Sequence, residues 1–219
     1  MRSKLQRFAD LRERDNTLEI GKPLFDRIKG NWNKLQFKNA NPIAIEVACG
    51  KGEYTVGLAR NMKETNFIGI DLKGERIWVG SEQAMDEGLH NVAFLRTHVL
   101  ELEKLFAPNE VAEIWLTFPD PRPKDRDEKR RLTHPRYLDI YKNILDEDGW
   151  FKFKTDNTGL FKYTLEILAD RDDIRDLEQT MNLYRSPLNS EHYGIQTRFE
   201  KKFSDAGETI KYLKFRFRK

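Results

Sequence analysis

Residues 117–124, Thr-Phe-Pro-Asp-Pro-Arg-Pro-Lys, place an acid and a base among three alternating prolines. Because proline has a fixed φ angle and no backbone N–H, this segment continues neither a helix nor a central strand. It follows the apolar residues 111–118, which predict a buried strand. We therefore expect a stiff loop beyond the carboxyl end of a strand, where ligands bind in open α/β sheets. Asp120 and Lys124 make it a candidate active-site loop; the alternative is a proline-rich turn with solvated charges.

Residues 46–52, Glu-Val-Ala-Cys-Gly-Lys-Gly, form a second candidate segment, where an apolar run changes to a helical pattern. Gly50 and Gly52 permit a tight turn and let a ligand approach the backbone closely. Asp71 ends the next apolar run, 21 residues beyond Gly50. In nucleotide-binding α/β folds, an acid at this place bonds the ribose hydroxyls.

The segment nevertheless departs from the dinucleotide-binding fingerprint, which requires a third glycine where this chain has Thr55. Glu46, upstream of the glycines, is also unusual for a nicotinamide enzyme. An acid, a glycine-rich turn and a second acid are instead typical of sites for S-adenosylmethionine. That cofactor has no phosphates, and its cationic sulfonium and ammonium groups tolerate nearby carboxylates, so it is the predicted cofactor.

Alternating strand and helix patterns surround these candidate residues. Apolar runs predict strands at residues 43–48, 67–70, 92–95, 113–118 and 150–153. Helical spacing predicts helices at residues 54–61, 75–87, 100–106, 135–145 and 160–168. This alternation predicts an α/β fold with a doubly wound, mostly parallel sheet.

The two ends of the chain have other patterns. Residues 1–20 are polar without a sustained apolar period, so we expect a flexible basic arm there. Apolar residues at helical spacing predict an N-terminal helix within residues 21–38. Near the other end, Phe199 and Phe203 indicate a helix, and residues 209–217 alternate as a strand with one basic face. That strand is expected to lie antiparallel at the sheet edge.

The composition of the chain limits its domain organisation, its cellular location and the kinds of site it can form. A chain of 219 residues suits one α/β domain with extensions. No apolar run approaches the roughly 20 residues needed to cross a membrane, and the first residues lack the apolar core of a signal peptide. Cys49 is the only cysteine, so no internal disulfide is possible, and a reducing, cytoplasmic location is the simplest expectation. Four histidines and one cysteine at no metal-ligand spacing predict no metal site.

The charges are unevenly distributed along the chain. Residues 1–38 hold ten Lys/Arg and five Asp/Glu, and residues 196–219 hold eight and three. Since the whole chain carries +3, the middle carries −7. Basic ends, with a third basic tract at residues 129–131, favour a nucleic acid as partner.

Five short segments occur in an order that resembles one family. They are Glu-Val-Ala-Cys-Gly-Lys-Gly-Glu at 46–53, Ile-Gly-Ile-Asp-Leu at 68–72, the proline loop at 118–124, Lys-Thr-Asp-Asn at 154–157 and Thr-Arg-Phe-Glu at 197–200. Together they resemble the bacterial tRNA (guanine-N7)-methyltransferase family, TrmB, from about residue 40 onward. The resemblance implies a class I S-adenosylmethionine-dependent methyltransferase domain over residues 39–219, with a Rossmann-like sheet and an antiparallel edge strand. It also implies methyl transfer to N7 of a guanosine in the tRNA variable loop.

The resemblance assigns roles to individual residues. It implies a cofactor site lined by Glu46, Gly50, Gly52, Asp71, His98 and Asp120. It implies contacts with the target guanosine from Lys124, Asp156, Thr197, Arg198, Phe199 and Glu200. This sequence departs from the family pattern at Ala48, Cys49, His98 and Arg122. We expect a methyl group at position 48 to be tolerated if the φ angle there is negative.

The chemistry is consistent with these residue types. Guanine N7 has a lone pair and no proton, so catalysis consists mostly of proximity and in-line alignment with the sulfonium methyl. Guanine becomes cationic as the methyl arrives, and Asp120 or Asp156 is the predicted electrostatic catalyst. Lys124 contacts either guanine O6 or a phosphate; the sequence does not choose.

Other interpretations remain open at this point. Glu46 is alternatively a buried structural acid, and Asp71 or Asp156 a helix cap. Thr197 and Glu200 also form the Thr-x-x-Glu pattern of a capping box. An amino-methyltransferase is the nearest rival, but it would have an aromatic residue in the proline loop. A non-catalytic RNA-binding protein is the rival from another class, and the sequence leaves a monomer or a homodimer open.

Overall fold

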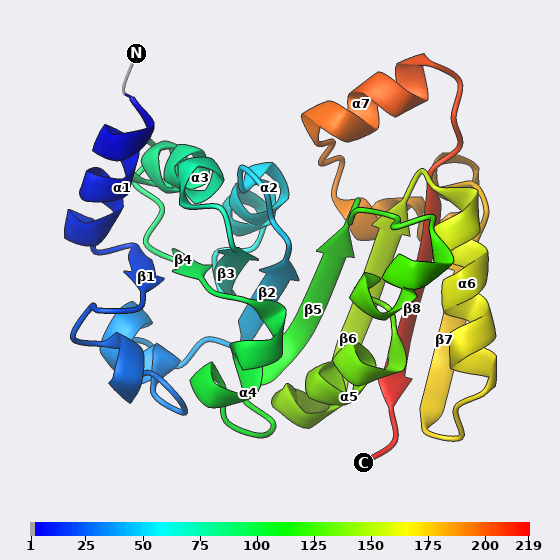
Figure 1. Cartoon of the computed structure of the whole chain (residues 1–219), viewed down its shortest axis with the longest axis horizontal. Helices are drawn as coiled ribbons and strands as arrows, with labels where there is room; N and C mark the ends of the chain where they lie inside the picture. The colour runs from blue at the N-terminus through cyan, green and yellow to red at the C-terminus, as the bar shows by residue number, and fades with distance from the viewer. Residues whose placement is uncertain (1–2) are drawn as a thin grey trace.

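The computed structural model describes residues 3–219, which form one eight-stranded sheet with helices on both faces (Figure 1). The strand order is β1-β4-β3-β2-β5-β6-β8-β7. The strands are β1 (Thr17–Glu19), β2 (Ile43–Val47), β3 (Asn66–Asp71), β4 (Val92–Arg96), β5 (Val111–Thr117), β6 (Leu145–Thr155), β7 (Ile174–Thr180) and β8 (Lys211–Phe217). The first six strands in this spatial order, β1-β4-β3-β2-β5-β6, pair in parallel with their neighbours. Strand β8 lies antiparallel to both β6 and β7.

The helices form two layers, so the sheet is buried on both faces (Figure 1). The α-helices are α1 (Lys4–Glu13), α2 (Glu53–Asn61), α3 (Gly74–Asp86), α4 (Leu102–Leu105), α5 (Pro135–Ile144), α6 (Thr158–Ala169) and α7 (Arg198–Asp205). One core lies between the sheet and α4, α5 and α6, and the other between the sheet and α1, α2 and α3. Successive residues of β2 show the alternation of a strand, since Ile45 enters the first core and Ala44 the second. The predicted doubly wound α/β fold is confirmed.

The antiparallel edge of the sheet differs in one respect from the prediction. The alternating residues near the C-terminus do form an antiparallel strand, β8, but it lies between β6 and β7 and not at the edge. Its basic face is covered: Lys214 contacts Glu178 and Glu191, and Arg216 lies over the ring of Trp150. Because these charges have protein partners, β8 offers no free basic surface to a nucleic acid.

The first 38 residues are more ordered in the structure than the sequence predicts. Lys4–Glu13 form α1, and Thr17–Glu19 pair with β4, where a flexible arm was expected; residues 1 and 2 lie outside the described residues. Arg7 of α1 and Arg14, which directly follows this helix, take part in the packing, since both lie over the ring of Trp78.

The helix expected within residues 21–38 is replaced by a 3-10 turn, Phe25–Arg27, and a π-helix, Trp32–Phe37. Gly30, with φ +72°, separates them. No α-helix among residues 3–219 combines the length and the apolar character needed to cross a membrane.

Candidate cofactor and substrate cleft

A cleft of about 740 Å³ lies at the carboxyl ends of the parallel strands. Segments following β4, β3, β2, β5 and β6 contribute to it in that spatial order. Five of the predicted site residues line it: Asp71, His98, Asp120, Asp156 and Phe199. A larger hollow, of about 1030 Å³, is lined by α1, α3 and the segments that follow them, and contains none of these residues. The chemistry predicted from the sequence therefore belongs to the strand-end cleft.

The backbone is strained at three residues that line the cleft. Ala48, Phe118 and Arg122 have φ angles of 59°, 47° and 46°, in the left-handed region that side chains disfavour. Each costs about 1–2 kcal/mol, and such strain gathers at functional sites. The condition under which a methyl group was expected to be tolerated at position 48, a negative φ angle, is not met, because the turn after β2 places Ala48 in the left-handed region.

Glu46 is buried beneath the glycine turn and does not line the cleft. Its carboxylate accepts hydrogen bonds from the Thr55 N–H at 2.8 Å, from the Thr55 hydroxyl, and from the Thr117 hydroxyl at 2.5 Å. Burial raises the pKa of Glu46 to about 7, although these hydrogen bonds oppose the rise. The carboxylate thus ties the start of α2 to the end of β5.

Asp71 ends β3 and holds the glycine turn in place. Its Oδ2 accepts the Gly50 N–H at 2.9 Å, and its Oδ1 accepts the Lys73 N–H at 2.8 Å. A carboxylate has about four lone-pair positions, so Asp71 retains capacity for a ligand's hydroxyl groups. Gly50 and Gly52 have φ angles of +59° and +73°, and a Cβ added at Gly50 would meet open space.

His98 lies at the cleft beyond β4 and caps a short helical turn. Its Nδ1 accepts the Leu100 N–H at 3.2 Å, as an aspartate at a helix N-cap would. This bond places the proton of the neutral ring on Nε2. His98 thus supplies a capping acceptor through Nδ1 and leaves Nε2–H free to act as a donor.

The proline loop carries Asp120 into the cleft but leaves Lys124 outside it. Asp120 accepts the Arg122 N–H at 3.2 Å and forms an ion pair with the Arg122 guanidinium at 3.1 Å. Lys124 precedes the 3-10 turn Asp125–Arg130 and is exposed. The structure thus brings the acid of this loop to the site and not its lysine.

Asp156 is half-buried in the cleft beyond β6. The N-cap of α6 is the next residue, Asn157, which accepts the Leu160 N–H at 2.8 Å, so Asp156 is not the helix cap. No other side chain among residues 3–219 donates a hydrogen bond to its carboxylate or forms an ion pair with it. Burial raises the pKa of Asp156, partly opposed by the charge of Lys211.

The Thr-x-x-Glu segment forms the predicted capping box at the start of α7. The Thr197 hydroxyl accepts the Glu200 N–H at 3.1 Å, and Glu200 accepts the Thr197 N–H at 3.3 Å. Phe199 is 65% exposed at the cleft, and Arg198 is exposed beside it. Glu200, in contrast, is fully buried and does not line the cleft.

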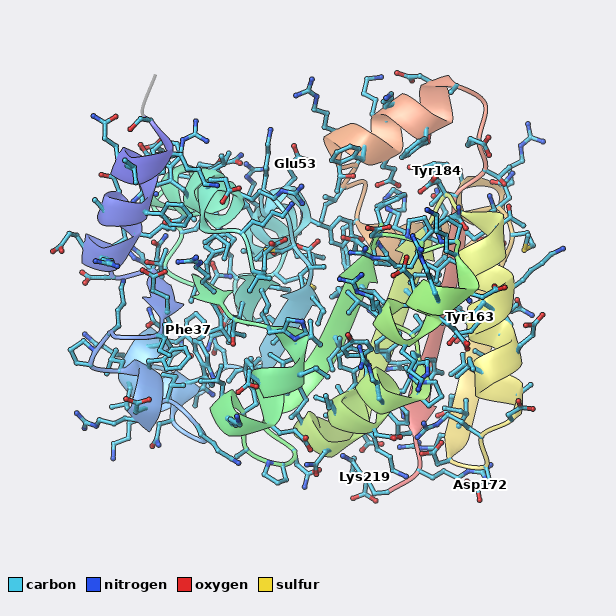
Figure 2. The ribbon with its side chains drawn as sticks, in the orientation of Figure 1. Phe37, Glu53, Tyr163, Asp172, Tyr184 and Lys219 are labelled. Atoms are coloured by element: carbon cyan, nitrogen blue, oxygen red, sulfur yellow. The ribbon has the colours of Figure 1, made fainter. Side chains whose placement is uncertain are left out.

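Lys154 is the site-associated residue whose place the sequence did not predict. Its ammonium group is fully buried and lies 2.6 Å from the Glu200 carboxylate. Burial lowers the pKa of Lys154, while Glu200 opposes this change. Tyr184 donates a second hydrogen bond to Glu200 at 2.5 Å, and Figure 2 shows Tyr184 beneath α7. The sequence does contain one signal for the burial of Lys154, because a lysine stands there at an inward position of an apolar strand.

The described residues 3–219 contain no group of three or more His, Cys, Asp or Glu side chains that could hold a metal ion.

Comparison with solved structures places the fold among methyltransferases. The structure titled "Crystal Structure of 16S rRNA Methyltranferase KamB" superposes with a TM-score of 0.60 at 13% identity, covering 82% of this chain and 89% of that one. "Structure of an antibiotic related Methyltransferase" gives a TM-score of 0.53 at 20% identity, covering 80% and 86%. At these identities the likeness concerns the fold alone.

Sequence comparison is more specific. A family model described as "Putative methyltransferase" matches residues 40–213. The tRNA (guanine-N(7)-)-methyltransferase of Cytophaga hutchinsonii is 47% identical, over 99% of this chain and 98% of its own. The proteins of the same name from Christiangramia forsetii and Bacteroides fragilis are 42% and 39% identical, over 99% and 98% of this chain and 99% and 85% of their own. With its methyltransferase fold and its acid-lined cleft at the strand ends, this chain belongs to the tRNA (guanine-N(7)-)-methyltransferase family.

Proposed function

We propose that this protein transfers a methyl group from S-adenosylmethionine to N7 of a guanosine in the variable loop of tRNA, in the cytoplasm. The observation that supports this most directly is the unpaired Asp156 carboxylate, half-buried in a cleft that also holds Asp71 and Asp120. A cationic ligand and a base that becomes cationic both suit such a site.

The cleft fits the proposed cofactor in size and in chemistry. Its volume is in the range of pockets that hold cofactors, roughly 300–1,000 Å³. Asp71, beside the glycine turn, is placed to accept the ribose hydroxyls, and Leu72 and Val99 offer apolar surface to the adenine. When bound, the cofactor supplies an electrophilic methyl group on a sulfonium. Asp120, one strand beyond the glycine turn, would offer a carboxylate to the sulfonium and ammonium charges of the cofactor.

Glu46 contributes to cofactor binding through the backbone. Its bonds to Thr55 and Thr117 fix the first turn of α2 against β5, which sets the position of the Gly50 and Gly52 turn. His98 holds the turn after β4 and presents its Nε2–H as a donor for the adenine. Both residues thus shape the cofactor half of the cleft.

The guanosine is proposed to enter at the β5 and β6 side. Asp156 is placed to accept the base's N–H groups and to stabilise the positive charge that develops at N7. Since N7 carries no proton, no general base is required before attack. Phe199 offers an exposed ring on which a splayed base can stack, as single-stranded RNA bases do on aromatic side chains. Lys124, Thr197 and Arg198 are proposed to contact the guanosine's phosphate or sugar.

The phosphates of the tRNA are proposed to bind the basic rim of the cleft. Five basic residues line it: Lys73, Arg76, Arg122, Arg130 and Arg136. The rim surrounds the cleft, so phosphate contacts there would orient the base toward Asp156.

The decisive experiment incubates the protein with methyl-labelled S-adenosylmethionine and unmodified tRNA, and then maps the label. Label at N7 of a variable-loop guanosine is the expected result. Label on another base would retain the cofactor and overturn the proposed substrate. Tight tRNA binding without any label would favour a non-catalytic RNA-binding protein.

A further inference from the structure

The buried ammonium of Lys154 lies where three segments of the site meet. It contacts the Glu200 carboxylate, in the first turn of α7, at 2.6 Å and the Ile195 carbonyl, just before α7, at 3.4 Å. The ring of Tyr54, in α2, lies 5.1 Å away, and that of Phe118, in the proline loop, lies 5.9 Å away. The side chain of Lys154 therefore contacts α2, which follows the glycine turn, the proline loop and α7.

The backbone of Lys154 strengthens the same junction. Its carbonyl accepts the Phe118 N–H at 2.8 Å, which fixes the strained first residue of the proline loop. The same strand ends one residue later, at Thr155, and Asp156 follows directly. Displacement of Lys154 would thus move both candidate catalytic carboxylates, Asp120 through the loop and Asp156 through the strand.

The start of α7 is anchored to α2 and β6 in this region. The Arg198 N–H donates to Glu53 at 2.8 Å, and Figure 2 shows Glu53 near that end of α7. Ile195 fills the space above Gly57, where an added Cβ would lie 2.8 Å from the isoleucine side chain. Both oxygens of Glu200 have protein donors: Lys154 and Tyr184 on Oε1, and the Thr197 N–H on Oε2. A carboxylate that is buried and satisfied in this way has no free face for a guanosine.

We propose that Lys154 and Glu200 form a positioning pair that fixes the proline loop, the end of β6 and α7 around the guanosine, and that Glu200 acts as the counter-ion of Lys154 and not as a ligand of the base. The proposal rests on the function proposed above. It assigns base contact within residues 197–200 to the exposed part of the segment, above all Phe199.

The test is a cycle of Lys154→Met, Glu200→Gln and the double variant, assayed for melting temperature, S-adenosylmethionine affinity and single-turnover methyl transfer to tRNA. Removal of one partner leaves the other charge buried alone, which is strongly destabilising. We expect each single variant to lose stability and about 100-fold in methyl transfer. Met and Gln preserve volume and the acceptor for Thr197, so the double variant should recover both, to within about tenfold of wild type in rate.

A matched control comes from the same strand and the same face. Lys152, largely buried, pairs with Glu113 at 2.8 Å and does not line the cleft. Lys152→Met with Glu113→Gln should change stability but leave the methyl-transfer rate of the folded protein at the wild-type value. Loss of methyl transfer in this control as large as in Lys154→Met would overturn the specific role of Lys154.

The two roles of Glu200 predict opposite results. If Glu200 bound the guanosine, the double variant would regain its melting temperature but remain as inactive as Glu200→Gln, and the proposal would be refuted. Wild-type protein assayed in parallel distinguishes failure of this proposal from failure of the proposed function, since an inactive wild type would refute the proposed function itself.

A second measurement needs no variant. Carbodiimide coupling with an amine labels accessible carboxylates, and Asp205, exposed in the same helix, is the positive control. We expect Asp205 to be labelled and Glu200 to stay unlabelled in the free protein. Labelling of Glu200 that tRNA then blocks would contradict the proposal, even if no variant folds.

Discussion

Substitution of Glu46 by glutamine should change how the stability of this protein depends on pH. Glu46 is buried, and its pKa rises from 4.5 to about 7 in the folded protein. Between these values the folded state binds the proton and the unfolded state does not, so the free energy of unfolding of wild type falls as pH rises. At about 1.4 kcal/mol per pH unit, the difference in pKa corresponds to about 3 kcal/mol in total.

Glutamine at this position is neutral at every pH and matches the surrounding hydrogen bonds. Its oxygen can accept from the Thr55 N–H and hydroxyl, and its amide group can donate to the Thr117 hydroxyl. The variant should therefore match wild type near about pH 4.5 and exceed it by about 3 kcal/mol near about pH 8.

Urea unfolding of both proteins between about pH 5 and about pH 8 measures this difference directly, because the contributions of all other groups cancel. A difference in the free energy of unfolding that stays constant across the range would show that Glu46 does not change its protonation there. The affinity for S-adenosylmethionine is a second readout. A change below about threefold agrees with a role through the backbone, whereas a loss above about tenfold would indicate direct contact with the cofactor.

Three further substitutions have simple expected outcomes. Asp156→Ala should lower the single-turnover rate about 100-fold while the cofactor affinity stays nearly unchanged, and equal rates in a folded variant would refute its catalytic role. Ala48→Gly should raise the free energy of unfolding by about 1 kcal/mol in urea titrations, because φ is +59° there; a destabilised variant would contradict the strain. Phe199→Ala should leave the melting temperature unchanged, since the ring is 65% exposed, and lower kcat/KM for tRNA about tenfold; unchanged kinetics would exclude stacking on the base.

The alternating core of the fold follows directly from sequence periodicity. Strands β2 to β6 and helices α2, α3, α5 and α6 have continuous apolar or amphipathic patterns. Each was predicted within two residues at either end, except that β6 begins five residues before the predicted strand. The same logic placed Asp71 and Asp120 at one edge of the sheet, because parallel strands present their carboxyl ends there. His98 and Asp156, which line the same cleft, were assigned to the site by the family resemblance.

Features without a local pattern were not predictable. Strand β7, Ile-Arg-Asp-Leu-Glu-Gln-Thr, is polar and partly exposed at the sheet edge, so it lacks the apolar alternation of a half-buried strand. The left-handed angle of Ala48 is set by the turn that it must make, not by its residue type.

Burial of charged residues was equally hidden from the sequence. Glu200 and Lys154 lie 46 residues apart in the chain, and only the folded protein brings their charges together. Residue type alone indicates exposure for both, since Lys and Glu are almost never fully buried unless they are paired.

The place of β8 in the sheet has a consequence for synthesis on the ribosome. Of the strands in the structure, β8 is translated last, yet it supplies the partner edges of both β6 and β7. Until it emerges, the nascent chain exposes an open edge on β6, and β7 has no strand to pair with. Unpaired edges of this kind recruit other chains, so the interval before β8 is complete is when aggregation and chaperone capture compete with folding.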